Sequence, residues 1–531
     1  MITKVFPFYF DFKPHTAILY PPKNILFLRS LSVNWGSKIP TITIITLLEI
    51  MITKLDIVDT QNTKILATVG PACSSYENLL KLIQAGVDVF RLNFSHSSHD
   101  EHLQIIQNIT KINQEHGIHI GILADLQGPK LRIGKIENGS IEVADGEIIT
   151  LVNHECVGTK EEIYMSYQKF PTDVEVGERV LVDDGKLVFE VVETNKLDTV
   201  RLKAVFGGTL SSNKGVNLPN TKISLPCLTE KDLKDLDFIL TQPVNWIALS
   251  FVRSAKDIKD LQQRIDAKGH PAKIIAKIEK PEAVENIDKI IKNTTAIMIA
   301  RGDLGIEVPM EKLPVIQKMI VRKCIQKSRP VIVATQMMDS MINNPSPTRA
   351  EITDVANAVL DGADAVMLSA ETSVGKHPVK VVEAMNKIID EAEKLRAYDN
   401  IRPKINPKSA TFLSDVVCLN AARTAEEINA KAIVGMTNSG YTAFKVSSYR
   451  PNTKIFIFSD QVHMLATLNL VWGVRCYYYD GFSSTDETIT DVTQYLKSKG
   501  KIVKGDIIVN SGSMPLHKRL RANMIKITIV E

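Results

Sequence analysis

The feature that most constrains the fold is a repeated alternation of short apolar runs with segments of helical periodicity. Eight apolar runs of strand length lie at residues 64–69, 87–94, 118–124, 246–250, 273–278, 296–300, 331–335 and 365–368. Helical segments fall between them, for example at residues 74–84, 99–116, 229–240 and 355–361. Near-continuous apolar runs are typical of parallel strands that are buried on both faces. Eight strand–helix units in succession therefore predict an α/β fold built on a (β/α)8 TIM barrel.

Charged and polar residues stand where these apolar runs end. Lys277 and Glu279 are two positions apart, so an extended backbone places both side chains on the same face. Further residues of this kind at the run ends are Arg91, Asn93, Asp125, Asp303 and Thr335. The carboxyl ends of the strands form the face that carries the chemistry of such barrels. Two carboxylates beside a lysine suit a divalent cation and a substrate with phosphate and carboxylate groups, whereas a salt bridge at the sheet rim would explain either carboxylate alone.

The strand–helix alternation stops between about residues 134 and 222. Short alternating runs, separated by Gly, Asn and Asp, occur there at residues 141–143, 148–152, 179–182, 187–192 and 199–204. They predict a small β-barrel domain inserted after the third barrel strand, where it could act as a lid over the site. Asp183-Asp184-Gly185 is interpreted as a tight hairpin turn that could reach the site when the lid closes.

A third region follows a Pro-containing linker near residues 401–407. A helix at residues 414–429 and strands at 432–436, 454–458, 474–478, 506–509 and 524–530 predict an open α/β sheet. The loop formed by Thr437, Asn438, Ser439, Gly440, Tyr441 and Thr442 follows a strand and opens a helix. Its amides and hydroxyls could bind a phosphate or could simply cap the helix. The predicted domains are 55–133 with 223–395 (barrel), 134–222 (lid) and 396–531 (C-terminal).

The first fifty residues differ from the rest of the 531-residue chain. They hold five Lys or Arg against two acidic residues, and so supply most of the net charge of +4. Because Met51-Ile-Thr-Lys repeats Met1-Ile-Thr-Lys, we interpret Met51 as the natural start and residues 1–54 as an extension that is disordered or not translated. No apolar run reaches the length of a membrane span, and the small net charge gives no reason to expect nucleic-acid binding. Six cysteines without a CxxC pair indicate a reducing compartment, so we expect a cytoplasmic protein.

Seven short segments carry a resemblance to a known family. In order along the chain they are Phe90-Arg-Leu-Asn-Phe-Ser-His96, Ala124-Asp-Leu-Gln-Gly-Pro-Lys-Leu-Arg132, Lys214-Gly-Val-Asn-Leu-Pro219, Ile275-Ala-Lys-Ile-Glu-Lys-Pro281, Met298-Ile-Ala-Arg-Gly-Asp-Leu-Gly305, Ala334-Thr-Gln-Met-Met338 and Pro347-Thr-Arg-Ala-Glu351. Any one of them could occur by chance, but seven in this order resemble the pyruvate kinases over residues 55–531. The resemblance implies transfer of a phosphoryl group from phosphoenolpyruvate to ADP, giving pyruvate and ATP, the last step of glycolysis.

The resemblance also implies roles for individual residues. Glu279 and Asp303 match the family's divalent-metal ligands, which normally hold Mg²⁺, with Mn²⁺ as an alternative. Lys277 would lie against the transferring phosphoryl group and offset its charge. Arg91 matches the family's phosphate-binding arginine, whose guanidinium can make bidentate contacts.

Two further matches concern the carboxylate and the enolate of the substrate. Gly302 and Asp303 would begin a turn whose backbone N–H groups hold the substrate carboxylate. Thr335 matches a threonine near the face on which the enolate is protonated, and we expect it to order a water relay. Positions that match the nucleotide-phosphate side of the site are Asn93, His96, Arg132 and Lys214. For His96 alone, a structural hydrogen bond is an equal alternative.

One departure from the usual family pattern concerns a monovalent cation. Many members bind K⁺ with the equivalents of Asn93, Ser95, Asp125 and the backbone carbonyl of Leu126. The set Leu126, Gln127, Lys130 and Ile133 instead resembles the branch that works without K⁺. The Lys130 ammonium would supply the positive charge that K⁺ supplies in other members. A bound K⁺ at close range to this ammonium would be repelled by it. We therefore expect activity that is largely independent of K⁺.

Regulation and assembly follow from the resemblance as further expectations. The family's site for phosphorylated effectors uses the loop matched by residues 437–442 and a glycine-rich loop near the C-terminus. Here the second loop, residues 511–521, is basic without being glycine-rich, so a solvated Lys/Arg cluster is an alternative to an effector site. The resemblance implies a homotetramer. Competing functions are a metal-dependent lyase or aldolase that acts through a pyruvate enolate, which has no evident need of Lys214 or a lid, and an inactive paralogue that serves as a sensor.

Overall fold

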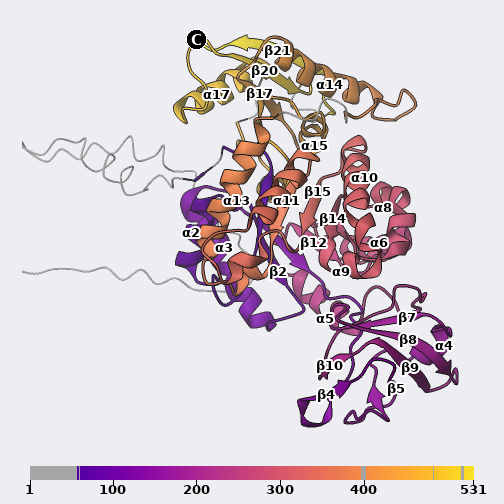
Figure 1. Ribbon diagram of the computed structural model, residues 1–531. Helices are drawn as coiled ribbons and strands as arrows, with labels where there is room; N and C mark the ends of the chain where they lie inside the picture. Colours follow the sequence, from indigo (N-terminus) through magenta and orange to yellow (C-terminus); the bar gives the residue numbers. More distant parts are fainter. Residues whose placement is uncertain (1–56, 59, 396–401, 482–483, 516–519) are drawn as a thin grey trace, which may run out of the picture. The chain divides into compact units, whose positions relative to one another are not determined.

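The eight apolar runs form a closed barrel of parallel strands in the computed structural model of the chain (Figure 1). Around the barrel the strands are β1 (Lys64–Thr68), β16 (Ala365–Leu368), β15 (Val331–Ala334), β14 (Ala296–Ala300), β13 (Lys273–Ile278), β12 (Trp246–Leu249), β3 (Gly121–Asp125) and β2 (Val89–Asn93). Each is parallel to both neighbours, so the predicted (β/α)8 barrel is confirmed. The structure describes residues 57–58, 60–395, 402–481, 484–515 and 520–531. The predicted extension and its interpretation from Met51 lie outside them.

The strands are apolar on both faces because the barrel has two separate hydrophobic layers. Inside it, side chains such as Leu66, Ile275 and Ile332 pack with Trp246. Their chain neighbours point outward and join a larger cluster between the strands and the surrounding helices. Alternation along each strand divides its residues between these two layers. This arrangement explains why the runs lack the polar alternation of a half-exposed strand.

Helices follow the barrel strands and surround them, as α2, α6, α8, α10, α11 and α13 show in Figure 1. The helices of this region are α2 (Tyr76–Ala85), α3 (His99–His116), α5 (Glu230–Ile239), α6 (Ala255–Ala267), α7 (Pro281–Glu285), α8 (Ile287–Asn293), α9 (Arg301–Glu307), α10 (Leu313–Gln326), α11 (Arg349–Leu360), α12 (Ala370–Ser373) and α13 (Pro378–Glu393), with short 3-10 helices η3 (Met310–Lys312) and η4 (Asp339–Ile342). Helix α11 begins six residues before its predicted start because Thr348 and Glu351 form a capping box. Helix α2 begins after Ser75, whose side chain accepts the Asn78 N–H.

The segment between β3 and β12 forms two sheets of mainly antiparallel strands with a hydrophobic core of their own. Its elements are η2 (Glu137–Gly139), β4 (Ser140–Val143), β5 (Ile148–Val152), β6 (Ile163–Tyr164), α4 (Phe170–Asp173), β7 (Arg179–Val182), β8 (Leu187–Thr194), β9 (Thr199–Phe206), β10 (Gly208–Ser211) and β11 (Val216–Asn217). The larger sheet has the order β11-β7-β8-β9-β5-β6 and surrounds buried side chains such as Phe189 and Leu202. Residues 183–185 all have positive φ and connect β7 to β8, so the predicted hairpin turn is confirmed. The limits 134–222 for this domain stay a prediction.

The C-terminal region forms the predicted α/β sheet. Its elements are α14 (Phe412–Glu427), β17 (Ala432–Met436), α15 (Tyr441–Ser448), β18 (Lys454–Ser459), α16 (Val462–Leu468), β19 (Val474–Tyr478), α17 (Thr485–Ser498), β20 (Ile507–Gly512) and β21 (Met524–Ile529). The strand order is β19-β18-β17-β20-β21, with β21 antiparallel.

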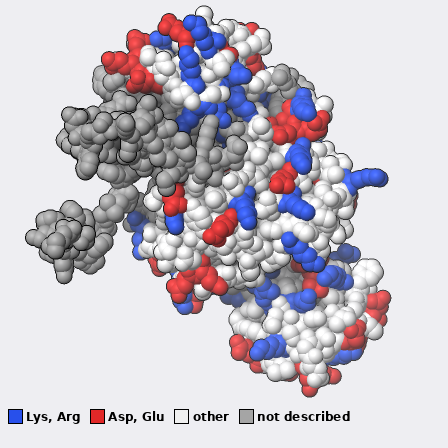
Figure 2. Space-filling view, turned by 90° about the vertical axis from the view of Figure 1, so that its left-hand side faces the viewer, with Lys and Arg blue, Asp and Glu red and all other residues white. Residues whose placement is uncertain are grey.

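The C-terminal region also contacts the amino-terminal end of the barrel. Leu470 joins the cluster of side chains inside the barrel, and the Trp246 indole donates a hydrogen bond to the Thr467 carbonyl at 3.2 Å. These contacts leave the carboxyl ends of the strands for a functional site. Among the described residues, no helix is both long and apolar enough to cross a membrane. Acidic and basic side chains are mixed over the face drawn in Figure 2.

Candidate active site

Four charged side chains meet at the carboxyl end of the barrel strands. Arg91 on β2 donates from Nε to Oδ2 of Asp125, the last residue of β3, at 2.7 Å. Lys277 near the end of β13 places Nζ 3.3 Å from Oδ1 of Asp125 and 2.9 Å from Oε1 of Glu279. The side chains of Asp125 and Glu279 are almost completely buried. The structure therefore brings together four residues that the sequence analysis took from three separate strand ends.

Mutual attraction offsets the effect of burial on the charges of Lys277 and Asp125. Burial alone would lower the pKa of the Lys277 ammonium, but Asp125 and Glu279 raise that pKa above its ordinary value. Burial alone would raise the pKa of Asp125, but Lys277 and Arg91 together hold it below the usual range. Burial raises the pKa of Glu279; the nearby Asp303 carboxylate adds to this effect and Lys277 opposes it. Lys277 is therefore a permanent cation at the centre of the site.

Two hydroxyl groups that the sequence analysis missed complete the cluster. The Lys277 ammonium donates to Oγ of Ser250 at 2.7 Å, and this hydroxyl donates in turn to the Leu126 carbonyl at 2.7 Å. The Arg91 guanidinium donates from Nη1 to Oγ1 of Thr68 at 3.0 Å. Thr68 lies near the end of the first predicted strand, and Ser250 lies at the end of the fourth. The rule that polar residues at strand ends form the site would have found both, had it been applied to all eight strands.

Glu279 and Asp303 offer oxygen ligands of the kind that a divalent cation requires. Oε2 of Glu279 accepts the Phe251 N–H at 2.7 Å, while the buried Oε1 accepts no hydrogen bond and has only the ion pair with Lys277. Asp303 is half-buried in the first turn of α9. The described residues contain no cluster of three or more metal-ligating His, Cys, Asp or Glu side chains. Two carboxylates fit Mg²⁺, which usually keeps several waters or takes substrate oxygens as its other ligands.

Gly302 and Thr335 lie in direct contact, and Gly302 and Asp303 lie in the first turn of a helix. The segment forms helix α9, and its Gly302 N–H donates to Oγ1 of Thr335 at 2.7 Å. Thr335 has a φ of 68°, which is strained for a β-branched residue. The Arg301 guanidinium stabilises this conformation, because it donates to the Thr335 carbonyl at 2.9 Å while paired with Asp354 at 2.6 Å. The sequence analysis gave Arg301 no role.

Two of the four residues assigned to the nucleotide side, Arg132 and Lys214, lie near each other. Arg132 donates to the Asn213 carbonyl at 3.0 Å, next to Lys214, whose ammonium lies 2.9 Å from Asp183 in the hairpin turn. Within the described residues, neither Arg132 nor Lys214 has a hydrogen bond or ion pair with the Arg91–Lys277 cluster. The side chain of His96 is exposed, and its backbone carbonyl faces Nε2 of His102 at 3.1 Å.

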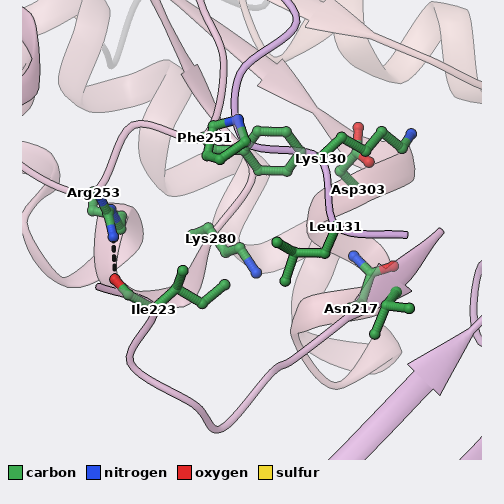
Figure 3. Close-up of a pocket in the computed structure, with 10 residues that line it drawn as sticks. Lys130, Leu131, Asn217, Ile223, Phe251, Arg253, Lys280 and Asp303 are labelled. Atoms are coloured by element: carbon green, nitrogen blue, oxygen red, sulfur yellow. Dashed lines mark hydrogen bonds between the residues drawn. The ribbon is translucent and has the colours of Figure 1, made fainter. Parts of the chain in front are cut away.

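The residues proposed for a monovalent cation have other contacts. Oδ1 of Asn93 accepts the Ser95 N–H at 3.2 Å, and the Leu126 carbonyl is occupied by the Ser250 hydroxyl. Lys130 is exposed and, together with Asp303, lines a pocket (Figure 3). The other residues that line this pocket are Pro129, Leu131, Val216, Asn217, Ile223, Phe251, Arg253 and Lys280.

Comparison with known proteins assigns this architecture to a family. Residues 60–382 match the family described as "Pyruvate kinase, barrel domain", and residues 415–528 match "Pyruvate kinase, alpha/beta domain". This chain belongs to the pyruvate kinase family. It is 42% identical over 477 residues to "Pyruvate kinase 2" of Synechocystis sp., an alignment that covers 89% of this chain and 80% of the relative. It is 41% identical over 470 residues to "Pyruvate kinase" of Corynebacterium glutamicum, covering 88% and 98% of the two chains.

A solved structure supports the same assignment. The crystal structure of a pyruvate kinase from Cryptosporidium parvum matches this chain with a TM-score of 0.83 and 35% sequence identity, covering 89% of this chain and 96% of the other. Pyruvate kinases are phosphotransferases, and the family generally uses Mg²⁺ and K⁺. The family assignment confirms the resemblance and does not favour the lyase, aldolase or sensor alternatives.

The predicted effector loop of this pyruvate kinase family member is internally bonded. The Gly440 N–H donates to Oγ1 of Thr437 at 3.0 Å, and Gly440 adopts a left-handed φ of 79° at the start of α15. The side chain of Thr442 is buried. Of the second loop, residues 516–519 lie outside the described residues, while Arg521 donates to the Ala410 carbonyl at 2.8 Å. The contact between Thr437 and Gly440 fits a helix cap, and an effector role stays a proposal.

Proposed function

We propose that this protein is a pyruvate kinase, which transfers the phosphoryl group of phosphoenolpyruvate to ADP and forms pyruvate and ATP. The observation that carries the proposal is the buried contact of Lys277 with Asp125 and Glu279, at the barrel end that also carries Asp303. A buried, permanently charged ammonium suits a reaction that depends on positioning and on compensation of negative charge. The comparison with known proteins supports the proposal independently. Relatives named pyruvate kinase match this chain over nearly its whole length.

The barrel residues bind and polarise phosphoenolpyruvate in this proposal. Glu279 and Asp303 would hold Mg²⁺, or Mn²⁺ in its place, and the ion supplies positive charge to substrate oxygens. Lys277 contacts the phosphoryl group and compensates the charge that spreads over its oxygens during transfer. Arg91 contacts the same group, with its orientation fixed by Asp125. As the bond between phosphorus and the enol oxygen breaks, a β-phosphate oxygen of ADP forms the new bond.

The loop of Thr335 acts in the second half of the reaction, in which the enolate is protonated. A substrate carboxylate that accepts the Gly302 N–H would displace the Thr335 hydroxyl from its present partner. The released hydroxyl can then order a water that gives its proton to the enolate carbon. A hydroxyl group has a pKa far above neutrality, so we assign proton donation to the relay and not to Thr335 itself.

The nucleotide phosphates are assigned to the residues Asn93, His96, Arg132 and Lys214. Lys214 belongs to the inserted domain, and its ion pair with Asp183 is one that ADP phosphates would replace. Exchange of one anionic partner for another costs little desolvation because the ammonium is already partly buried. This arrangement gives the inserted domain a direct part in binding the second substrate.

Independence from K⁺ is the finer part of the proposal. Asp125, the carboxylate that would attract K⁺, is already paired with two cations, Arg91 and Lys277. The Leu126 carbonyl already accepts a hydrogen bond from Ser250. Lys130 supplies a further positive charge beside the pocket that Asp303 also lines. We therefore propose that activity does not require a monovalent cation bound at Asn93, Ser95, Asp125 and Leu126.

Assembly, control and location complete the proposal. Exposed apolar side chains on η3, α10 and α11, among them Met310, Val315 and Ile352, support a homotetramer because a partner would cover them. Residues 437–442 would bind a phosphorylated effector. The free thiols of all six cysteines support a reducing compartment, and we propose the cytoplasm.

The test is pyruvate formation from phosphoenolpyruvate and ADP with Mg²⁺, in buffers with and without K⁺. We expect equal turnover in both buffers. Turnover only with K⁺ would retain the kinase and refute the independence from K⁺. No turnover in either buffer, with phosphoenolpyruvate still bound in a calorimetric titration, would refute the kinase in favour of the sensor.

A further inference from the structure

A second buried charge cluster joins the inserted domain to the barrel. The Lys280 ammonium lies 2.6 Å from Oε1 of Glu307, and the Asn217 carboxamide donates to the same oxygen at 2.9 Å. The side chain of Lys280 is 9% exposed and that of Glu307 is 1% exposed. Asn217 belongs to β11 in the inserted domain, Lys280 follows β13 of the barrel, and Glu307 is the last residue of α9. Three separate elements are therefore joined through one carboxylate oxygen.

Each member of this cluster is close in the chain to one residue of the proposed active site. Lys280 directly follows Glu279. Glu307 is four residues after Asp303, so the two side chains lie on one side of α9. Asn217 comes three residues after Lys214, which precedes β11 in the loop that leads into this strand. The cluster thus connects the two proposed metal ligands to the proposed nucleotide lysine.

The cluster is also incompletely satisfied. Oε2 of Glu307 is buried and has no hydrogen-bond donor, whereas Oε1 takes both contacts. Native proteins rarely leave a buried carboxylate oxygen unpaired without a functional reason. Figure 3 shows Lys280 and Asn217 extending into the same pocket, which is also lined by Asp303. A purely structural salt bridge would have no need of a partner from the inserted domain beside this pocket.

We propose that Glu307 is a positioning residue that sets the inserted domain, through Asn217, relative to the metal-ligating carboxylates, through Lys280 and α9. The inference rests on the proposed function, because it gives the cluster a role in bringing ADP to the metal-bound end of the barrel. Loss of the Asn217 contact lets Lys214 move away from the barrel while the phosphoenolpyruvate residues stay in place. ADP binding then weakens and phosphoenolpyruvate binding does not.

The experiment compares Asn217→Ala with the matched variant Asn153→Ala in the full chain. Asn217→Ala removes the contact between domains and leaves the Lys280–Glu307 pair intact. Asn153 is also an inserted-domain asparagine, but its carboxamide donates within that domain, to the Gln168 and Leu197 carbonyls at 3.1 Å. For each protein we would measure KM for both substrates, and hydrogen exchange of residues 301–308 without substrates.

We expect Asn217→Ala to raise KM for ADP about tenfold, as for a lost hydrogen bond to a charged group, with KM for phosphoenolpyruvate changed less than twofold. Exchange in α9 should become at least fivefold faster, and Asn153→Ala should change neither quantity. Equal changes in both KM values, or an unchanged α9, would overturn the proposal. Wild-type protein without turnover would refute the kinase, whereas the exchange comparison would still report on the cluster.

A second variant tests the charge of Glu307. Glu307→Gln keeps an acceptor for Asn217 but leaves Lys280 as an uncompensated cation next to Glu279. We expect the dissociation constant for Mn²⁺, measured by electron paramagnetic resonance without substrates, to rise at least fivefold. Unchanged Mn²⁺ binding in a folded variant would refute the coupling to the metal ligands. If this variant does not fold, Asn217→Ala still decides the proposal, since it retains the buried ion pair.

Discussion

Replacement of Lys277 by methionine separates the chemical from the structural role of this lysine. In the folded protein the Lys277 ammonium lies within 3.3 Å of two carboxylates and donates to the Ser250 hydroxyl. Methionine fills similar volume without charge. The variant therefore removes the cation that faces the phosphoryl group and leaves Asp125 and Glu279 with less compensation.

The structure gives a magnitude for each effect. A unit charge in contact with a phosphoryl oxygen, about 4 Å away at an effective dielectric constant of about 20, is worth about 4 kcal/mol. If the charge is felt mainly in the transition state, turnover falls about 10³-fold. Removal of one partner from a buried ion pair costs about 3–5 kcal/mol of stability. Arg91 still compensates Asp125, so we expect the lower end of that range.

The assay needs a control with the same structural cost. Lys64 is a fully buried lysine at the start of β1, paired with Asp88 at 3.2 Å and bonded to the Val474 carbonyl at 2.8 Å. It lies at the opposite end of the barrel strands from Lys277. Lys64→Met should lose a similar free energy of unfolding in urea, with turnover changed less than threefold. Turnover of both variants is measured at a temperature where circular dichroism shows them folded.

Either of two results would refute this reasoning. A fall of less than tenfold in the turnover of folded Lys277→Met would show that the ammonium does not compensate the transferring group. An equal loss of turnover in Lys64→Met would show that reduced stability, and not the missing charge, explains the effect.

Three further predictions concern other parts of the molecule. Thr335→Val should slow enolate protonation, measured by deuterium uptake into pyruvate, because the hydroxyl that orders the relay is lost; unchanged turnover would refute the relay. Lys130→Glu should make turnover depend on K⁺, since a negative charge beside the site then needs a cation; activity without K⁺ would contradict this. Burial lowers the pKa of His119 to about 4, below its ordinary value near 6.5. Below pH 6.5 the ring becomes protonated in the unfolded chain but stays neutral in the folded protein. The free energy of unfolding therefore decreases, by at most about 3 kcal/mol, as the pH falls from 6.5 to 4. The free energies of unfolding of wild type and His119→Phe, measured in urea, should diverge between pH 6.5 and 4. The same dependence on pH in both proteins would refute this prediction.

The barrel could be predicted because its signal is local and repeated. A strand that is buried on both faces needs an apolar residue at nearly every position, and each run from residues 64–69 to 365–368 shows this pattern. The polar residues at the strand ends were equally visible, so Arg91, Asp125, Lys277 and Glu279 were found before the structure. The distances between these side chains could not be predicted, because such distances depend on the order of the strands around the barrel.

Helix α9 shows where local reasoning is insufficient. Arg301-Gly-Asp-Leu-Gly305 contains two glycines within five residues, and glycine disfavours a helix by about 1 kcal/mol each. From the family resemblance, only a turn that begins at Gly302 and Asp303 was expected here. In the structure, contacts from outside the segment decide the outcome: Thr335 accepts the Gly302 N–H, and Asp354 pairs with Arg301. Long-range contacts of this kind leave no trace in the local composition.

The balance of charge in the site is the property that only the structure supplies, and it argues for an external cation. The buried cluster contains two cations, Arg91 and Lys277, and two anions, Asp125 and Glu279, which three successive ion pairs connect. Asp303 adds a negative charge close enough to raise the pKa of Glu279. An anionic substrate that enters this site meets no net positive charge from these five residues. A divalent metal at Glu279 and Asp303 would correct that deficit, which is why substrate binding and metal binding should be strongly cooperative in this protein.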